Sequence, residues 1–150
     1  MGVVGAPCVA HRVWPTPTVP SGDPPLRTST SADSLPAVGQ GALGIECRAD
    51  RQDLVELLRP LHDAETAACV LAERAMSRAL AGSCQVPLGG FAEVSGKQLR
   101  MRGFVASPDG KRLIRAEQTG STDKPEDVGN AVADALRAQG ADEILALLNG

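Results

Sequence analysis

The sequence predicts an α+β domain: a three-stranded antiparallel sheet with helices packed on one face, preceded by an orphaned strand–helix segment and a disordered tail. Three observations lead to this class. Residues 63–80 repeat small apolar side chains at helical spacing, residues 91–119 alternate apolar and polar side chains around two turns, and residues 125–148 return to a helical pattern. Strands joined by short turns pair antiparallel, and the helices that flank them in the sequence then cover one face of the sheet.

The 150 residues divide into three parts by composition. Residues 1–34 hold six of the eleven prolines and show no apolar period, which predicts a disordered tail. Residues 35–60 are expected to form an interdomain segment of one strand and one helix. Residues 61–150 are expected to form the C-terminal domain.

The segment 35–60 begins with an apolar run, Val38–Ile45, that glycines interrupt. This run predicts a loop leading into a strand over about residues 42–48. Asp50 is a suitable N-cap for the helix that follows. That helix carries four apolar side chains: Leu54, Val55, Leu57 and Leu58. Pro60 ends it, because proline disfavours helical backbone at the residue before it.

The strongest helix signal covers residues 63–80. Its apolar stripe consists of alanines and one leucine: Ala64, Ala67, Ala68, Leu71, Ala75 and Ala79. Such small side chains permit close packing against a sheet or another helix. Gly82 is well placed to end this helix.

Three strands follow, over residues 91–94, 98–105 and 112–119. The middle strand places four residues on one apolar face: Leu99, Met101, Gly103 and Val105. Turns over residues 95–97 and 107–110 join the strands, because glycine, proline and aspartate favour turn conformations.

The last long helix begins at Pro125, a favoured first-turn residue, with Glu126 and Asp127 beside the positive end of the helix dipole. Its predicted buried stripe is Val128, Ala131, Val132, Ala135 and Leu136. Gly140 ends the helix, and residues 142–148 form one further short helix.

Composition and charge argue against several classes of function. A net charge of −3, the absence of a basic run and 2% aromatic residues argue against nucleic-acid binding. No apolar stretch approaches the ~20 residues that span a bilayer, and the N-terminus lacks the pattern of a signal peptide. The cysteines at positions 8, 47, 69 and 84 contain no C-x-x-C pair, so we expect reduced thiols and no metal site.

Cys84 is the residue with the clearest chemical potential. It lies in Ala81-Gly-Ser-Cys-Gln-Val-Pro-Leu-Gly-Gly90, between a predicted helix and a predicted strand. The flanking elements would hold the cysteine in place, and its small neighbours would let a bulky adduct reach the sulfur. Taken alone, a loop cysteine is more often inert than reactive.

This stretch also carries a resemblance to a known family. Cys84-Gln-Val-Pro-Leu-Gly89 resembles the cofactor-attachment signature of hydroxymethylbilane synthases, also called porphobilinogen deaminases, and Ala72–Leu80 resembles the helix before it. Leu35-Pro-Ala-Val-Gly-Gln-Gly-Ala-Leu-Gly-Ile-Glu46 is similar to a second signature, where the chain crosses between domains near the cofactor cleft. Gly103–Gly110 matches the strand–turn region of the family. The resemblance covers residues 35–150.

The resemblance implies a cytoplasmic transferase of tetrapyrrole and heme biosynthesis. Family members are three-domain enzymes, usually monomeric, that condense four porphobilinogen molecules into a linear tetrapyrrole and release ammonia. The growing pyrrole chain is carried on a dipyrromethane cofactor, which a thioether would fix here to Cys84. Such an anchor makes each addition effectively intramolecular.

The resemblance further implies cofactor contacts by Gln40, Gly41 and Ala42, whereas the simpler alternative makes the glycines only a hinge. It places no catalytic residue in this chain. The carboxylate and the arginines that serve the family's reaction belong to the first two domains, and residues 1–34 contain nothing that matches them.

Other polar and cysteine residues are interpreted as structural. Cys47 and Cys69 are expected to be small core residues in a strand and a helix, and His62 a capping or surface residue. Glu73 and Arg74 are expected to make surface or interdomain pairs rather than to act in catalysis.

Three interpretations of the whole chain remain open. It is a truncated piece of such an enzyme that is inactive alone, a stand-alone binding module that reuses the third-domain fold, or one part of a split enzyme. In each case the apolar side chains of residues 54–58 either pack against the C-terminal domain or form an exposed apolar patch.

Overall fold

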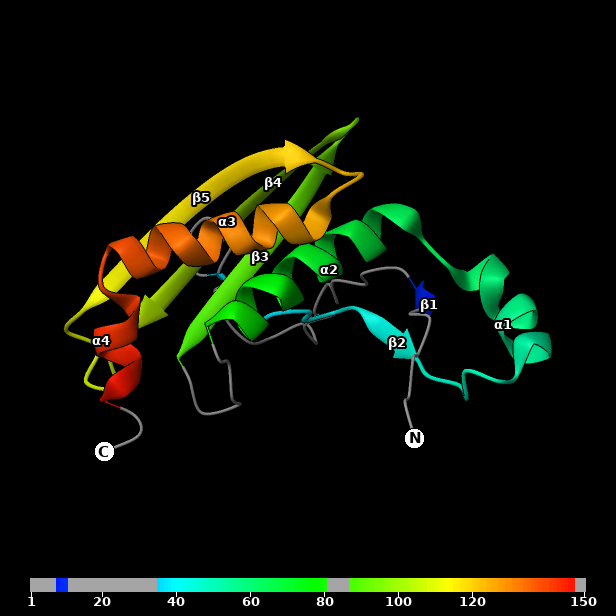
Figure 1. Ribbon diagram of the computed structural model, residues 1–150, viewed down its shortest axis with the longest axis horizontal. Coiled ribbons are helices and arrows are strands. Elements are labelled where there is room, and N and C mark those ends of the chain that lie inside the picture. The colour runs from blue at the N-terminus through cyan, green and yellow to red at the C-terminus, as the bar shows by residue number, and fades with distance from the viewer. Residues whose placement is uncertain (1–7, 11–34, 81–86, 148–150) are drawn as a thin grey trace, which may run out of the picture.

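The structure is a computed structural model that describes residues 8–10, 35–80 and 87–147. The described backbone forms short strands β1 (Cys8–Ala10) and β2 (Leu43–Ile45), a sheet of β3 (Leu88–Ser95), β4 (Gln98–Ala106) and β5 (Leu113–Ser121), helices α1 (Gln52–Leu58), α2 (Ala64–Ala79), α3 (Pro125–Ala138) and α4 (Ala141–Ala146), and the 3₁₀ turn η1 (Arg59–Leu61). Figure 1 shows α2 and α3 side by side on one face of the sheet. The predicted α+β class is therefore confirmed.

The main sheet is an antiparallel meander in the order β3-β4-β5. Ser95 pairs with Gln98 and Ala106 with Leu113, so both connections are short. Gly96 and Gly110 have φ values of 61° and 71°, a left-handed conformation that glycine adopts without steric cost. Both predicted turns are thus confirmed. Strand β3 is four residues longer than predicted, and β4 and β5 are each one residue longer.

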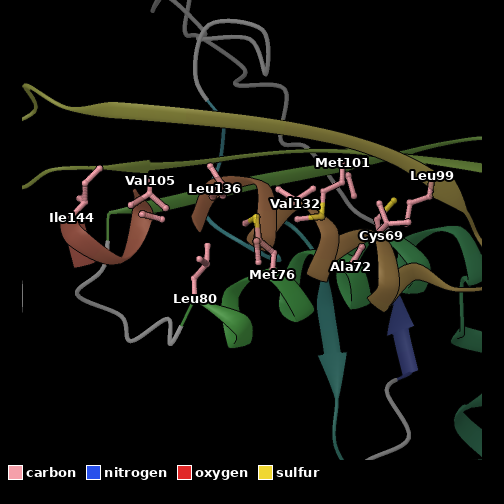
Figure 2. Close-up of a cluster of buried hydrophobic side chains, with 14 residues drawn as sticks. Cys69, Ala72, Met76, Leu80, Leu99, Met101, Val105, Val132, Leu136 and Ile144 are labelled. Atoms are coloured by element: carbon pink, nitrogen blue, oxygen red, sulfur yellow. The ribbon is translucent and has the colours of Figure 1, made fainter. Parts of the chain in front are cut away.

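The core lies between the sheet and the two long helices (Figure 2). Alternate residues of β4 point into it, as the period-2 pattern predicts, and three of them are completely buried: Leu99, Met101 and Val105. Leu136 of α3 and Ile144 of α4 are completely buried on the helical side. The core is aliphatic and sulfur-containing, in keeping with the scarcity of aromatic residues.

Three residues of the stripe predicted for α2 are buried: Ala67, Ala68 and Ala75. The buried face is wider than predicted, because Cys69, Ala72 and Met76 are buried as well, whereas Ala64 is exposed. The predicted stripe did not include these three further residues. Met76 fills a space that glycines leave open: a Cβ atom built on Gly90 would lie 2.7 Å from its Cε.

Helix α3 begins at Pro125, as predicted, and most of its predicted buried stripe is confirmed. Val128, Val132 and Leu136 are buried, but Ala131 is exposed and its place is taken by Ala133. The reason is that α3 faces both the sheet and α2. Gly129 forms the second contact, where an added Cβ would overlap the backbone oxygen of Ala72.

The segment before α2 differs from the prediction in two details. Helix α1 starts at Gln52 with Arg51 as its N-cap and no side-chain cap bond, so the cap assigned to Asp50 is wrong. The Asp50 carboxylate instead accepts a hydrogen bond from Arg48 Nε at 3.0 Å. Strand β2 pairs antiparallel with β1, so three residues of the stretch expected to be a disordered tail form a strand. Residues 1–7 and 11–34 of that stretch lie outside the described residues.

The apolar side chains of α1 are not buried in the domain. None of its residues is buried: Leu57 is 72% exposed, whereas Leu54, Val55 and Leu58 are half-buried. Figure 1 shows α1 at the opposite end of the molecule from α4. Between α1 and the start of α2 and α3 lies an open groove of about 480 Å³, lined in part by Val55, Ala68 and Leu71.

The sheet face away from the helices is polar and charged. Arg100 Nε and Nη2 each donate to a Glu117 carboxylate oxygen at 2.8 Å across β4 and β5. This bidentate pair lowers the pKa of Glu117 from its ordinary value, chiefly through the hydrogen bonds. Arg102 lies over the Phe91 ring at 5.6 Å and donates to Glu93 at 3.0 Å. Charged pairs of this kind suit a face that contacts water.

Replacing Gly129 with alanine tests the close packing of α2 on α3. In an ordinary helix interior this change would stabilise the fold by up to ~1 kcal/mol, because alanine has the higher helix propensity. Here we expect a loss of roughly 1–3 kcal/mol, because the new methyl group overlaps the Ala72 backbone. Urea denaturation would measure it, with Asn130→Ala on the exposed side as the matched control. Equal or greater stability of the Gly129 variant would contradict the packing described.

Candidate functional site

Cys84, the predicted attachment residue, falls within residues 81–86, which lie outside the described residues. The structure does describe both flanks of this segment. On one side Leu80 is 1% exposed, and its N–H donates to the Met76 carbonyl at 3.0 Å. On the other side the Pro87 carbonyl accepts from the Ala106 N–H at 3.0 Å. Both flanks are therefore fixed to the folded core by backbone hydrogen bonds.

The second predicted contact region, Gln40 to Ala42, forms a tight loop. Gly39 and Gly41 have φ values of 72° and 83°, and the Ala42 N–H donates to the Gly39 carbonyl at 3.2 Å. Gln40 and Gly41 are exposed. Ala42 is half-buried and packs against Ala67 and Val70 of α2. The loop thus turns Gln40 and Gly41 outward, and its last residue anchors it to the helix.

Glu73 holds this loop to the domain. Its side chain is completely buried, with 0% exposure, although the sequence indicated a surface or interdomain position. One carboxylate oxygen, Oε2, accepts from the Gly39 N–H at 2.7 Å. The other, Oε1, accepts from the Ala92 N–H of β3 at 2.8 Å. The expectation of a surface pair was wrong because the backbone groups that this carboxylate binds come from distant parts of the chain.

A signal for this burial is present in the sequence. Glu73 stands four residues after Cys69 and three before Met76, so it lies on the same side of α2 as two buried residues. A charge inside an apolar stripe is rare unless hydrogen bonds satisfy it. Arg74, the next residue, is exposed, as expected.

A second bond joins the loop region directly to β3. The Gly90 N–H donates to the Pro36 carbonyl at 3.0 Å. Gly90 is only two residues before Ala92, which binds Glu73. The structure therefore brings together the 36–42 segment, α2 and the first half of β3, the last two being the elements on either side of Cys84 in the sequence.

The structure also places Cys69, Cys47 and His62, for which the sequence indicated structural roles. Cys69 is buried in α2, as expected, but Cys47 is half-buried and lies beyond the end of β2 rather than inside a strand. His62 is exposed, and the cap of α2 is instead Asp63, whose Oδ1 accepts from the Thr66 N–H at 2.8 Å. Within the described ranges no three His, Cys, Asp or Glu residues come close enough to hold a metal ion.

The comparison with known proteins fits this arrangement. Residues 67–138 match the family model "Porphobilinogen deaminase, C-terminal domain". The matched region runs from early α2 through the end of α3 and includes both flanks of Cys84.

The chain carries the C-terminal domain of the porphobilinogen deaminase family.

Individual porphobilinogen deaminases show the same similarity. The Nitrosomonas europaea enzyme is 62% identical over 115 residues, which are 77% of this chain and 37% of that protein. The Methylobacillus flagellatus enzyme is 60% identical over 124 residues, 82% of this chain and 40% of that protein. The Laribacter hongkongensis enzyme is 57% identical over 116 residues, 77% and 38% respectively. The chain therefore spans about two fifths of the length of these porphobilinogen deaminases.

Glu73→Gln tests the hydrogen bonds that Glu73 makes in this porphobilinogen deaminase domain. The amide has one accepting oxygen instead of two, so either Gly39 or Ala92 loses its acceptor. We expect a stability loss of about 1–3 kcal/mol, the usual cost of a buried donor without its partner. Hydrogen exchange should quicken at one of the two amides. Glu65→Gln, on an exposed position of the same helix, is the matched control. Unchanged exchange at both amides would show that Glu73 does not hold them.

Proposed function

We propose that this chain is the cofactor-carrying part of a porphobilinogen deaminase and that Cys84 holds a dipyrromethane cofactor through a thioether. The observation that carries the proposal is the family match across residues 67–138, which includes Cys84. Identity of 56–62% to five porphobilinogen deaminases supports it. In the same proposal residues 61–150 are the cofactor-carrying domain, residues 35–60 an interdomain segment and residues 1–34 a tail outside the family.

The described surroundings of Cys84 fit a bulky covalent group. The backbone fixes both flanks of the cysteine segment, and the loop beside them presents an exposed glutamine, Gln40, and an exposed glycine, Gly41. Among the described residues, no atom apart from those of Gly39 and its two chain neighbours lies within 4 Å of the position that a Cβ on Gly39 would take. This open space leaves room for a ligand next to the loop. We propose that Gln40 and the backbone of Gly41 and Ala42 contact the cofactor there.

The attachment step balances as a substitution with loss of water. The Cys84 sulfur gives up its proton and forms a bond to the terminal methylene carbon of a hydroxymethyl pyrrole. The carbon–oxygen bond of that hydroxymethyl group breaks, and hydroxide leaves with the proton as water. The bound cofactor then supplies the pyrrole carbon to which the porphobilinogen units are added. The role of the protein residues is to hold this end of the growing chain in one place.

We propose that the carboxylate that supports the deamination of porphobilinogen does not come from the described residues. Glu73 is buried, and both its oxygens are engaged by backbone N–H groups. Positive charge that develops on a pyrrole ring needs a positioned anion, and substrate carboxylates need cationic partners. We propose that other parts of the enzyme supply these groups. We also propose that the enzyme is cytoplasmic and, like most members of the family, monomeric.

Cys84 is expected to be the only cysteine of the chain that acquires a pyrrole adduct. The chain is incubated with preuroporphyrinogen (hydroxymethylbilane) and with a polypeptide made of the part of the Nitrosomonas europaea enzyme that precedes the matched region. Mass spectrometry of the digested chain then locates the adduct. Cys84→Ser should abolish it, whereas Cys47→Ser should leave it unchanged. An adduct on Cys47 or Cys69, with Cys84 unmodified, would refute the assignment.

The 150-residue polypeptide by itself is expected not to convert porphobilinogen into hydroxymethylbilane. Anchoring provides proximity, which contributes up to about 7–11 kcal/mol in well-oriented cases, but it does not stabilise the charge that deamination creates. Porphobilinogen consumption is measured with a full-length relative as positive control. Turnover that Cys84→Ser abolishes would contradict the prediction. Turnover that appears only after the supplementing polypeptide is added would favour a split enzyme over an inactive fragment.

A further inference from the structure

Glu73 occupies a position from which it can control the geometry of the proposed cofactor site. We propose that Glu73 is a positioning residue for that site: its carboxylate fixes the Gly39–Ala42 loop to β3 and so sets the place of this loop relative to the segment that carries Cys84. The inference rests on the proposed function and deepens it by naming a residue on which attachment at Cys84 depends.

The Glu73 carboxylate binds one backbone N–H group with each of its oxygens. Its two oxygens are 2.7 Å from the Gly39 nitrogen and 2.8 Å from the Ala92 nitrogen. Hydrogen bonds to a charged acceptor are short and about twice as strong as neutral ones. Gly39 and Ala92 are far apart in the sequence, so one side chain joins two segments that share no covalent connection nearby.

The 36–42 segment is attached to β3 at two points. The Pro36 carbonyl accepts directly from Gly90, and the Gly39 N–H reaches β3 through Glu73. Ala42 in addition packs against α2 at the end of the loop. The bond from Gly39 to Glu73 fixes the loop between Pro36 and Ala42, so the outward face of Gln40 and Gly41 is held in one orientation.

Glu73 connects the two elements on either side of the Cys84 segment. It lies on α2, which leads into the Cys84 segment, and it binds β3, which follows that segment. The loop with Gln40 and Gly41 is the third element. The Glu73 carboxylate therefore connects the two elements that flank Cys84 with the loop proposed to contact the cofactor.

The cost of burying this carboxylate argues against a purely stabilising role. A buried anion must recover a desolvation penalty of several kcal/mol, and a well-packed apolar residue often gives equal or greater stability. An apolar side chain of similar volume could fill the space beside Met76 and Cys69. It could not accept from Gly39 and Ala92 at once. The carboxylate therefore contributes what an apolar side chain cannot: it fixes the position of the loop relative to the sheet.

The experiment measures attachment and folding separately. Glu73→Gln keeps the side-chain length but loses one of two acceptors. Its uptake of preuroporphyrinogen on Cys84, with the supplementing polypeptide present, should slow by about tenfold, the factor that corresponds to roughly 1.4 kcal/mol at 25 °C. Alkylation of Cys84 by iodoacetamide should proceed at the wild-type rate, because the thiol itself is not altered. Glu65→Gln should match the wild type in both measurements.

A second variant acts at the other end of the same hydrogen bond. Gly39→Ala keeps Glu73 and strains the loop at its φ of 72°, where no neighbouring atom would clash with the new methyl group. It should slow attachment in the same way and leave hydrogen exchange at Ala92 unchanged. In the double variant the loss of attachment rate should be smaller than the combined losses of the two single variants, because both substitutions disturb the same hydrogen bond. This variant also carries the test if Glu73→Gln does not fold.

The outcomes distinguish this inference from the proposed function. Absence of an adduct on Cys84 of the wild-type chain would refute the proposed function itself. Wild-type attachment together with unchanged rates in folded Glu73→Gln and in Gly39→Ala would overturn the positioning role alone. Slower iodoacetamide alkylation in parallel with slower attachment would also overturn it, because access to the thiol would then explain both.

Discussion

The close approach of α2 to its neighbours is the constraint on which the rest of the domain depends. Helix α2 contacts α3 where Gly129 leaves no side chain in front of the Ala72 backbone. It contacts the sheet through Met76, whose side chain occupies the space that Gly90 and Gly103 leave free. Small residues thus allow one helix to pack against two layers at once. Only a helix held this closely to β3 can place a buried carboxylate within hydrogen-bond distance of the strand backbone.

The same packing explains why a charged residue is tolerated in the core. Glu73 is completely buried, and the backbone N–H groups it binds belong to β3 and to the 36–42 segment. Neither segment could be reached if larger side chains separated α2 from the sheet. The arrangement therefore links core packing to the proposed site. The aliphatic core fixes the position of α2, α2 fixes the position of the Glu73 carboxylate, and the carboxylate fixes the position of the loop.

Most of the fold could be predicted because its elements follow local rules. The alternation of Leu99, Met101 and Val105 predicted the buried face of β4, and Pro125 predicted the start of α3. Errors arose where a pattern had several solutions. The buried faces of α2 and α3 are wider than the predicted stripes because each helix faces two partners, and residue periodicity alone gives one direction per helix. The cap assigned to Asp50 failed because Arg48 competes for its carboxylate.

The sequence by itself determined the family, the three strands, the long helices and the cysteine that the family signature marks, because these depend on side-chain order along a short stretch. Tertiary structure alone decided the role of Glu73, the outward orientation of Gln40 and Gly41, and the attachment of Pro36 to Gly90. Each of these joins residues that are far apart in the chain. The position of Glu73 on α2 indicates burial, but only the folded chain shows which distant backbone N–H groups donate hydrogen bonds to its carboxylate.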